Sequence, residues 1–180
     1  MKDYIKLLSI FCLFIFLVAG CMPTSKPAHK EIEKEEPETT SLSLAPDFIL
    51  PDTEHNLVTL SSYRDRQAVI LFFWTTWCPY CRRELKSLND KYPQLQKDNV
   101  ELLAINIGEP AYRVENFIGI HSLNFKVLLD KDTDVAYSYD ILGIPTYVFL
   151  NKQGDIAFRN NYLSQDEYKQ FISNNFLIFQ

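Results

Sequence analysis

Residues 68–81 read AVILFFWTTWCPYC, and this stretch decides the fold. The run 68–74 is wholly apolar and rich in β-branched and aromatic side chains, which predicts a strand buried on both faces. Cys78 and Cys81 follow it directly. After them, apolar side chains recur at the spacing of an amphipathic helix, at Leu85, Leu88, Tyr92 and Leu95. The cysteine pair therefore lies where a buried strand passes into a helix.

Strand-like and helix-like segments alternate along the globular part of the chain, residues 45–180. Strands are expected at 100–107, 126–129, 146–151 and 155–159, and helices after Pro110, around 133–139 and from Ser164. The last two strands form a hairpin around the turn-forming residues 152–154, and Glu167 completes a capping box with Ser164. This order predicts an α/β fold with a mixed central sheet flanked by helices. With a Cys-x-x-Cys at the end of the first central strand, the order is thioredoxin-like.

Charge and composition narrow the class of partner. The 180-residue chain is 47% apolar and carries a net charge of −5, with 18 Lys+Arg against 23 Asp+Glu. These proportions are typical of one globular domain plus an additional segment. The densest basic cluster is the pair Arg82-Arg83, which carries far less positive charge than the basic surfaces that bind phosphate backbones. No nucleic-acid partner is expected.

The position of the cysteines predicts thiol chemistry. Cys78 is expected at the N-terminus of the helix, where unpaired backbone N–H groups favour a thiolate, the form that attacks disulfides. Cys81 lies one helical turn further on, close enough to attack the mixed disulfide and release the substrate. The pattern therefore predicts a thiol-disulfide oxidoreductase in which Cys78 attacks and Cys81 resolves. No metal, flavin or nucleotide is implied.

Three other uses of the pair compete. A structural disulfide would close too small a loop to stabilise the fold much. A metal site needs two further ligands, and the histidines lie in unrelated segments, at His29, His55 and His121.

The third alternative is a peroxiredoxin-type peroxidase. The opening Ala-Pro-Asp-Phe at 45–48 and Thr75, three residues before Cys78, favour it. Leu71 stands where such enzymes carry a proline, which disfavours it.

The N-terminus has the pattern of a secretory signal. Lys2 and Lys6 precede an apolar run at 7–18 and the small residues Ala19-Gly20. A membrane-spanning helix needs roughly 20 apolar residues, so a permanent transmembrane anchor is the weaker interpretation.

Residues 17–21, LVAGC, resemble the lipobox of bacterial lipoproteins, in which the cysteine is acylated after cleavage just before it. We expect a signal peptide at 1–20 and a lipid on Cys21, against the alternative of a generic secreted protein. Cys12 would leave with the signal. Residues 21–44, rich in Lys, Glu, Pro and Ser, would form a flexible tether rather than an interaction tail. The protein would lie outside the cytoplasmic membrane, on its outer face or facing the periplasm, with one remaining thiol pair.

Over residues 45–180 the chain resembles the TlpA/ResA-like family of membrane-tethered, extracytoplasmic, thioredoxin-fold thiol-disulfide oxidoreductases. The matching pieces are Ala-Pro-Asp-Phe at 45–48, Phe-Phe-Trp-Thr-Thr-Trp-Cys-Pro-Tyr-Cys at 72–81, Glu84, Asn-Ile-Gly-Glu at 106–109 and Gly-Ile-Pro-Thr at 143–146. The resemblance implies a thioredoxin core with a strand-helix insertion, for which residues 100–129 are in the right place. It also implies a monomeric reductase of disulfides in exported proteins, in several members apocytochrome c. A membrane thiol carrier of the CcdA/DsbD kind would recharge it, and no cofactor beyond the redox-active disulfide is implied.

The resemblance also assigns site residues. Pro145 would be a cis-proline facing the disulfide, which leaves the backbone of Ile144 free to pair with an extended substrate. The alternative is a trans proline opening an edge strand. Glu84 would lie beneath the sulfurs and pass a proton to or from Cys81. The alternative is an exposed carboxylate in an ion pair. The remaining docking residues would be Trp77, Pro79, Tyr80 and Thr146, with packing as the alternative role of Trp77.

Some positions depart from the family pattern. Phe72 stands where thioredoxin has a buried aspartate, so a buried proton relay would have to rest on Glu84. Lys86 replaces a proline two residues after that glutamate. The pair Pro79-Tyr80 between the cysteines resembles glutaredoxins, and Asn160-Asn161 replace a glycine beside the substrate groove. An oxidant or isomerase, and a redox-inactive assembly factor that binds a partner, therefore stay open as alternatives.

Overall fold

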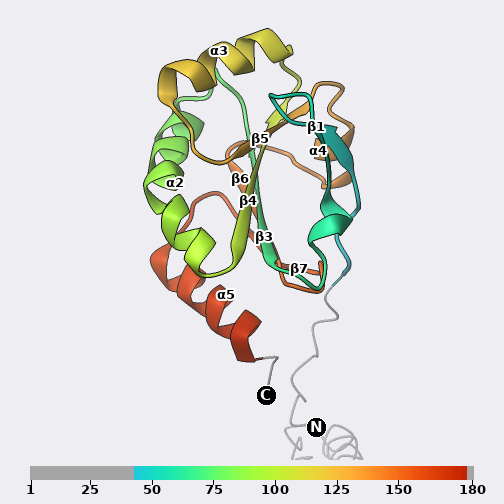
Figure 1. Cartoon of the computed structure of the whole chain (residues 1–180), viewed down its shortest axis with the longest axis vertical. Coiled ribbons are helices and arrows are strands. Elements are labelled where there is room, and N and C mark those ends of the chain that lie inside the picture. The colour runs from blue at the N-terminus through green and yellow to red at the C-terminus, as the bar shows by residue number, and fades with distance from the viewer. Residues whose placement is uncertain (1–42, 178–180) are drawn as a thin grey trace, which may run out of the picture. The chain divides into compact units, whose positions relative to one another are not determined.

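A computed structural model describes residues 43–177, and side chains through residue 174 (Figure 1). The predictions of a signal peptide at 1–20, a lipid on Cys21 and a tether at 21–44 fall on residues 1–42, outside the described residues, apart from the last two positions of the tether. In the described part of the chain, no helix combines the length and apolar character needed to cross a membrane.

A five-stranded sheet of order β5-β4-β3-β6-β7 forms the centre of the domain. The strands are β3 (Ala68–Trp74), β4 (Val100–Ile107), β5 (Lys126–Asp130), β6 (Thr146–Leu150) and β7 (Ile156–Asn160). Strands β3, β4 and β5 are parallel, whereas β6 runs antiparallel to both β3 and β7. The predicted α/β fold with a mixed, thioredoxin-like sheet is confirmed, and the observed strands differ from the expected ranges by no more than one residue at either end.

Helices cover both faces of this sheet (Figure 1). They are α2 (Pro79–Lys97), α3 (Ala111–His121), α4 (Asp134–Ser138) and α5 (Gln165–Leu177). Buried side chains of α2, α3 and α5 share one apolar cluster with the sheet, and those of α4 contribute to a second cluster on the opposite face. The arrangement is therefore a three-layer sandwich with two cores.

Strand β3 separates the two cores. All seven of its residues are buried. Ile70, Phe72 and Trp74 belong to the cluster shared with α2, and the residues between them belong to the other. This alternation follows from the pleat of a strand, which sends successive side chains to opposite faces.

An N-terminal hairpin was not predicted from the sequence. Its strands β1 (Ile49–Pro51) and β2 (Leu57–Thr59) have three residues each, too few to show a period, and a 3-10 helix (Leu60–Tyr63) follows. The Asp47 carboxylate accepts hydrogen bonds from the N–H groups of Phe48 and Ser61 at 3.0 and 2.8 Å. The Tyr139 hydroxyl donates to the Pro46 carbonyl at 2.6 Å. These contacts fix the chain segment that closes the core on the α4 side.

The start of α5 differs in detail from the predicted capping box. The N–H of Glu167 donates to the Ser164 hydroxyl at 3.2 Å, as expected. The Glu167 carboxylate accepts a hydrogen bond from that same hydroxyl. Its two oxygens also accept from the Asn160 side-chain amide, at 2.8 and 2.7 Å. The helix start is therefore tied to the end of β7 as well as to its own cap.

Helix α2 should depend on its buried face for stability. We expect Leu88→Ala to lower the free energy of unfolding by about 2–5 kcal/mol, because Leu88 is 1% exposed and its loss leaves a cavity. Lys86→Ala, on the exposed side of the same helix, should change it by less than about 0.5 kcal/mol. Urea denaturation of both variants followed by circular dichroism measures the difference. Equal effects would mean that this face does not pack as described.

Candidate active site

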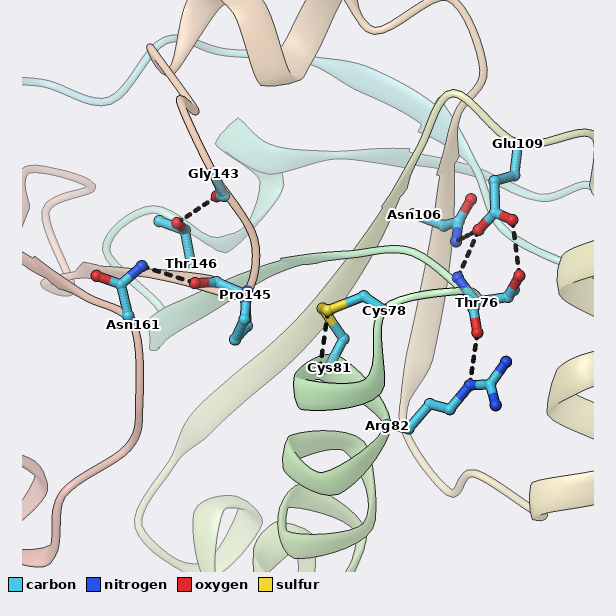
Figure 2. The surroundings of a disulfide bond; sticks show 10 residues. All are labelled: Thr76, Cys78, Cys81, Arg82, Asn106, Glu109, Gly143, Pro145, Thr146 and Asn161. Carbon is cyan, nitrogen blue, oxygen red and sulfur yellow. Dashed lines mark hydrogen bonds between the residues drawn. A yellow bond between two sulfur atoms is a disulfide. The ribbon is translucent and has the colours of Figure 1, made fainter.

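Cys78 and Cys81 form a disulfide at the N-terminus of α2, with Cα atoms 5.2 Å apart (Figure 2). Cys78 is the N-cap residue, and its Sγ atom accepts a hydrogen bond from the N–H of Cys81 at 3.1 Å. Pro79 occupies the first helical turn, where its missing N–H costs nothing. A sulfur placed here meets the positive end of the helix dipole, which stabilises a thiolate.

The two sulfurs differ in access to solvent. Cys78 is 4% exposed and Cys81 is 0% exposed. The side chains around them stand out from the surface, with Trp77 and Tyr80 each more than 60% exposed (64% and 63%). Trp77 is thus not a packing residue of the core, a position that Trp74 takes instead. Both cysteines are largely buried, and Cys78 is the slightly more exposed of the two.

The Ile144–Pro145 peptide bond is cis, and Pro145 lies among the residues that surround the disulfide (Figure 2). No hydrogen bond joins the backbone of Ile144 to any other described residue, because β6 begins only at Thr146. The Thr146 hydroxyl donates to the Gly143 carbonyl at 2.7 Å. The Asn161 side chain donates to the Pro145 carbonyl at 2.9 Å. Asn161, which replaces the glycine expected beside the groove, therefore braces this loop.

An open groove of about 600 Å³ is lined by Trp77, the residue before Cys78, and by Ile144, the residue before the cis-proline; neither cysteine lines it. Its walls combine Trp77 and Ile144 with exposed apolar side chains of Tyr137 and Leu142 and with one cation, Arg113. A groove of this composition can hold an extended, mainly apolar peptide segment.

Glu84 is half-buried on α2, one turn after Cys81. Its carboxylate accepts a hydrogen bond from the Tyr147 hydroxyl at 2.7 Å and makes no ion pair with a described lysine or arginine. Burial, and then the hydrogen bond to Glu84, raises the pKa of Tyr147. The phenol therefore stays protonated and always donates to Glu84. Phe72, in the place of the aspartate of thioredoxin, packs against Tyr147 with their ring centroids 4.6 Å apart.

Glu109 provides a second carboxylate near the disulfide. The residue is only 4% exposed and so is more buried than Glu84. It accepts hydrogen bonds from the N–H and the hydroxyl of Thr76 at 2.6 and 2.7 Å and from the Asn106 amide at 2.8 Å. Arg113 lies 3.7 Å away. The sequence placed Glu109 only inside a matching motif and did not single it out as a buried carboxylate near the disulfide. The signal for Glu109 was its place directly after a buried strand, inside the motif Asn-Ile-Gly-Glu at 106–109.

Among the described residues, no group of three or more His, Cys, Asp and Glu side chains could hold a metal ion. His55 and His121 lie in an N-terminal turn and at the end of α3, apart from the cysteines. Cys78 and Cys81 are bonded to each other.

Comparison with known proteins agrees with this geometry. Residues 43–159 match the AhpC/TSA family. The chain is 36% identical to the thiol-disulfide oxidoreductase ResA of Geobacillus thermodenitrificans over 73% of its own length and 76% of that protein. It is 40% identical to ResA of Geobacillus kaustophilus over 63% of its length and 65% of the relative.

Solved structures show the same fold. The crystal structure of StoA from Bacillus subtilis superposes with a TM-score of 0.61 at 28% identity, over 72% of this chain and 98% of StoA. The chain thus combines a disulfide at a helix start with sequence similarity to known thiol-disulfide oxidoreductases. It belongs to the AhpC/TSA family and, with the ResA proteins, to the thiol-disulfide oxidoreductases.

Proposed function

We propose that the protein is a lipid-anchored reductase that breaks disulfides in exported proteins. The observation that carries this proposal is the placement of the Cys78 sulfur. It accepts the Cys81 N–H at the start of α2, in the same surroundings as Pro145 (Figure 2), whose cis bond follows the unpaired backbone of Ile144. One surface thus offers a nucleophile and an edge along which an extended substrate can align.

The exchange proceeds in two steps. The Cys78 thiolate attacks one sulfur of the substrate disulfide, forms a mixed disulfide and releases the other substrate sulfur as a thiolate. Cys81 then attacks Sγ of Cys78, which restores the Cys78–Cys81 disulfide and releases the second substrate thiol. The substrate gains two electrons and the protein loses two.

Substrate docking is assigned to the residues around the sulfurs. The free N–H and carbonyl of Ile144 pair with an extended segment, in the manner of an added β-strand. Pro145 holds that segment against Cys78, with Thr146 behind it. Trp77, Pro79 and Tyr80, all exposed, line the approach.

Glu84 is proposed to manage the proton of Cys81. Side chains three positions apart on a helix are neighbours, so Glu84 is on the same side of α2 as Cys81. Tyr147 holds it in place with a hydroxyl that does not ionise. A carboxylate here can take the proton of Cys81 when that residue attacks.

The proposed direction, reduction, rests on the same carboxylate. Strong disulfide oxidants owe their potential to a stabilised reduced form with a low-energy thiolate. A negative charge on Glu84 opposes thiolate formation and so favours the oxidised protein. Because the oxidised form is favoured, the reduced protein gives up its two electrons readily, as a reductase must.

The location is proposed from the lipobox-like sequence at 17–21, outside the described part of the chain, and the partners from the resemblance to the TlpA/ResA-like family. A lipid on Cys21 would hold the domain at the membrane through a flexible tether, on the extracytoplasmic side. Electrons would then come from a membrane thiol carrier of the CcdA/DsbD kind, and exported proteins such as apocytochrome c would be the substrates. Mass spectrometry of the membrane fraction, with Cys21→Ser as control, tests the anchor directly.

The reduction potential of the Cys78–Cys81 pair tests the direction. We expect a value near the roughly −270 mV of thioredoxin or lower, measured in the soluble domain after equilibration in graded thiol buffers. A value near the roughly −120 mV of strong oxidants would mean that the protein acts as an oxidant and not as a reductase.

Trapping tests the roles of the two cysteines. Cys81→Ser should accumulate a mixed disulfide between Cys78 and its substrate, because the resolving thiol is gone. Cys78→Ser should trap nothing and abolish function. Non-reducing gels of the two variants expressed in cells show the difference. If Cys78→Ser kept both partner binding and cellular function, the protein would be an assembly factor rather than a reductase.

The Glu84–Tyr147 pair can be tested by the pH dependence of resolution. We expect Glu84→Gln to slow release of the mixed disulfide by at least about 10-fold at neutral pH, because Cys81 loses its base. The deficit should shrink as the pH rises, since hydroxide then removes the proton. Rapid quenching of the mixed disulfide over a pH series measures it.

Tyr147→Phe is the matched control for this measurement. It keeps the ring against Phe72 and removes only the hydroxyl, at a cost of about 1 kcal/mol in unfolding free energy, so the slowing should be smaller than in Glu84→Gln. Faster resolution in Glu84→Gln would mean that the carboxylate acts only as an opposing charge.

A further inference from the structure

Thr76, two residues before Cys78, is held at each of its polar atoms (Figure 2). Its N–H donates to Oε2 of Glu109 at 2.6 Å, and its hydroxyl donates to Oε1 of the same carboxylate at 2.7 Å. Its carbonyl accepts from Nε of Arg82 at 2.7 Å. A turn residue is rarely fixed by two side chains from separate elements, and this one carries the active cysteine with it.

The Glu109 side chain that makes this contact is itself costly to bury. Removing a carboxylate from water is unfavourable unless hydrogen bonds and a counter-charge replace the solvent. Here the replacements are three hydrogen bonds from Thr76 and Asn106 and a half-exposed Arg113 at 3.7 Å. An apolar side chain in this position would leave the N–H and hydroxyl of Thr76 and the Asn106 amide without this acceptor, so the glutamate serves the contacts it makes rather than packing alone.

The backbone places Glu109 for this contact. Strands β3 and β4 are parallel neighbours in which Trp74 pairs with Asn106, so the turns that follow them emerge side by side at one edge of the sheet. Gly108 turns the chain with a φ of +68°, and a Cβ atom there would lie 3.2 Å from Thr133. The carboxylate therefore links the turn after β4 to the turn after β3.

Trp77 is the residue that this link leaves at the surface. It follows Thr76 directly, is 64% exposed and forms a wall of the groove together with Ile144 and Glu109 itself. Thr76 is fixed on one side of Trp77 and helix α2 starts just beyond it, so the backbone that carries the indole is held at both ends.

We propose that Glu109 is a positioning residue of the active site, whose carboxylate holds Thr76 and thereby directs Trp77 and Cys78 toward a polypeptide substrate. Glu109 touches neither the substrate disulfide nor the reacting sulfurs. Its role rests on thiol-disulfide exchange as such, and holds whether the protein works as a reductase or as an oxidant.

Four variants separate positioning from charge and from stability. Glu109→Gln can keep the contacts: its carbonyl in the place of Oε2 accepts from Thr76 N–H and Asn106, and its amide donates to the Thr76 hydroxyl. Glu109→Ala loses them all. Thr76→Val removes one hydrogen bond and keeps the shape. Glu101→Ala is the matched control. Glu101 is also a glutamate 3.7 Å from a cation, Lys126, but it lies at the start of β4, away from the cysteines.

The measurement is the rate at which each reduced protein reacts with two oxidants in stopped flow: a disulfide-bonded peptide with extended flanks, and Ellman's reagent. We expect Glu109→Ala to react about 30-fold more slowly with the peptide, and Thr76→Val about 5-fold, because they remove two and one, respectively, of the hydrogen bonds that Thr76 makes to Glu109. Rates with Ellman's reagent, which needs no groove, should change by less than about 3-fold. Glu109→Gln and Glu101→Ala should behave as the unchanged protein with both oxidants.

Time-resolved anisotropy gives an independent readout. The chain has two tryptophans, of which only Trp77 is exposed, so a fast component that acrylamide quenches reports on Trp77. This component should grow in Glu109→Ala and stay unchanged in Glu109→Gln.

Two results would overturn the proposal. If Glu109→Ala and Thr76→Val slowed both oxidants equally, the effect would be on the sulfurs or on stability and not on substrate positioning. If Glu109→Gln were as slow as Glu109→Ala, the charge rather than the contacts would matter. Should Glu109→Ala fail to fold, Thr76→Val and Glu109→Gln still decide between these outcomes.

Discussion

Burial of β3 on both faces is the constraint on which the rest of the structure depends. Every side chain of this strand is apolar and at most 4% exposed, and its backbone is hydrogen-bonded to β4 on one edge and β6 on the other. Such a strand admits no polar chemistry along its length. The chemistry begins where the strand stops, at Thr75, and the reversal into α2 places Cys78 at the first free N–H groups of that helix.

Polar groups inside the domain concentrate at that same end of the sheet. Six polar residues are buried among those described, and five of them lie at or just beyond the carboxyl ends of the parallel strands: Thr75, Thr76, Asn106, Glu109 and Asp130. In open α/β sheets, sites form at this edge because loops from neighbouring strands meet there. The Asp130 carboxylate accepts the N–H groups of Val135 and Ala136 and so fixes the start of α4. The edge therefore holds both the thiols and the groups that shape the groove beside them.

The two carboxylates near the thiols differ in their surroundings, and this suits them to different tasks. Glu84 is half-buried, accepts one hydrogen bond from a neutral hydroxyl and lies one helical turn after Cys81. Glu109 is buried, accepts three hydrogen bonds and faces Arg113, an environment that keeps it in place. The loop across the site has a corresponding brace, since Asn161 holds the Pro145 carbonyl. Both walls of the groove are thus held by side-chain hydrogen bonds.

The sequence by itself determined the sheet, the helices and the thiol pair. A wholly apolar run at 68–74 and apolar side chains at helical spacing after it leave few alternatives, because each period is a local property of the chain. The role of the cysteine pair was predictable for the same reason, because it depends on the strand before the pair and the helix after it.

Only the tertiary structure decided which side chains meet across the fold. The bond between Tyr147 and Glu84 spans 63 positions, and that between Thr76 and Glu109 spans 33. No local period predicts such pairs, since they depend on which strands become neighbours and on how each turn leaves the sheet. The short N-terminal hairpin could not be predicted for the same reason. Its strands are too short to show a period of their own and are stabilised by contacts with the rest of the domain.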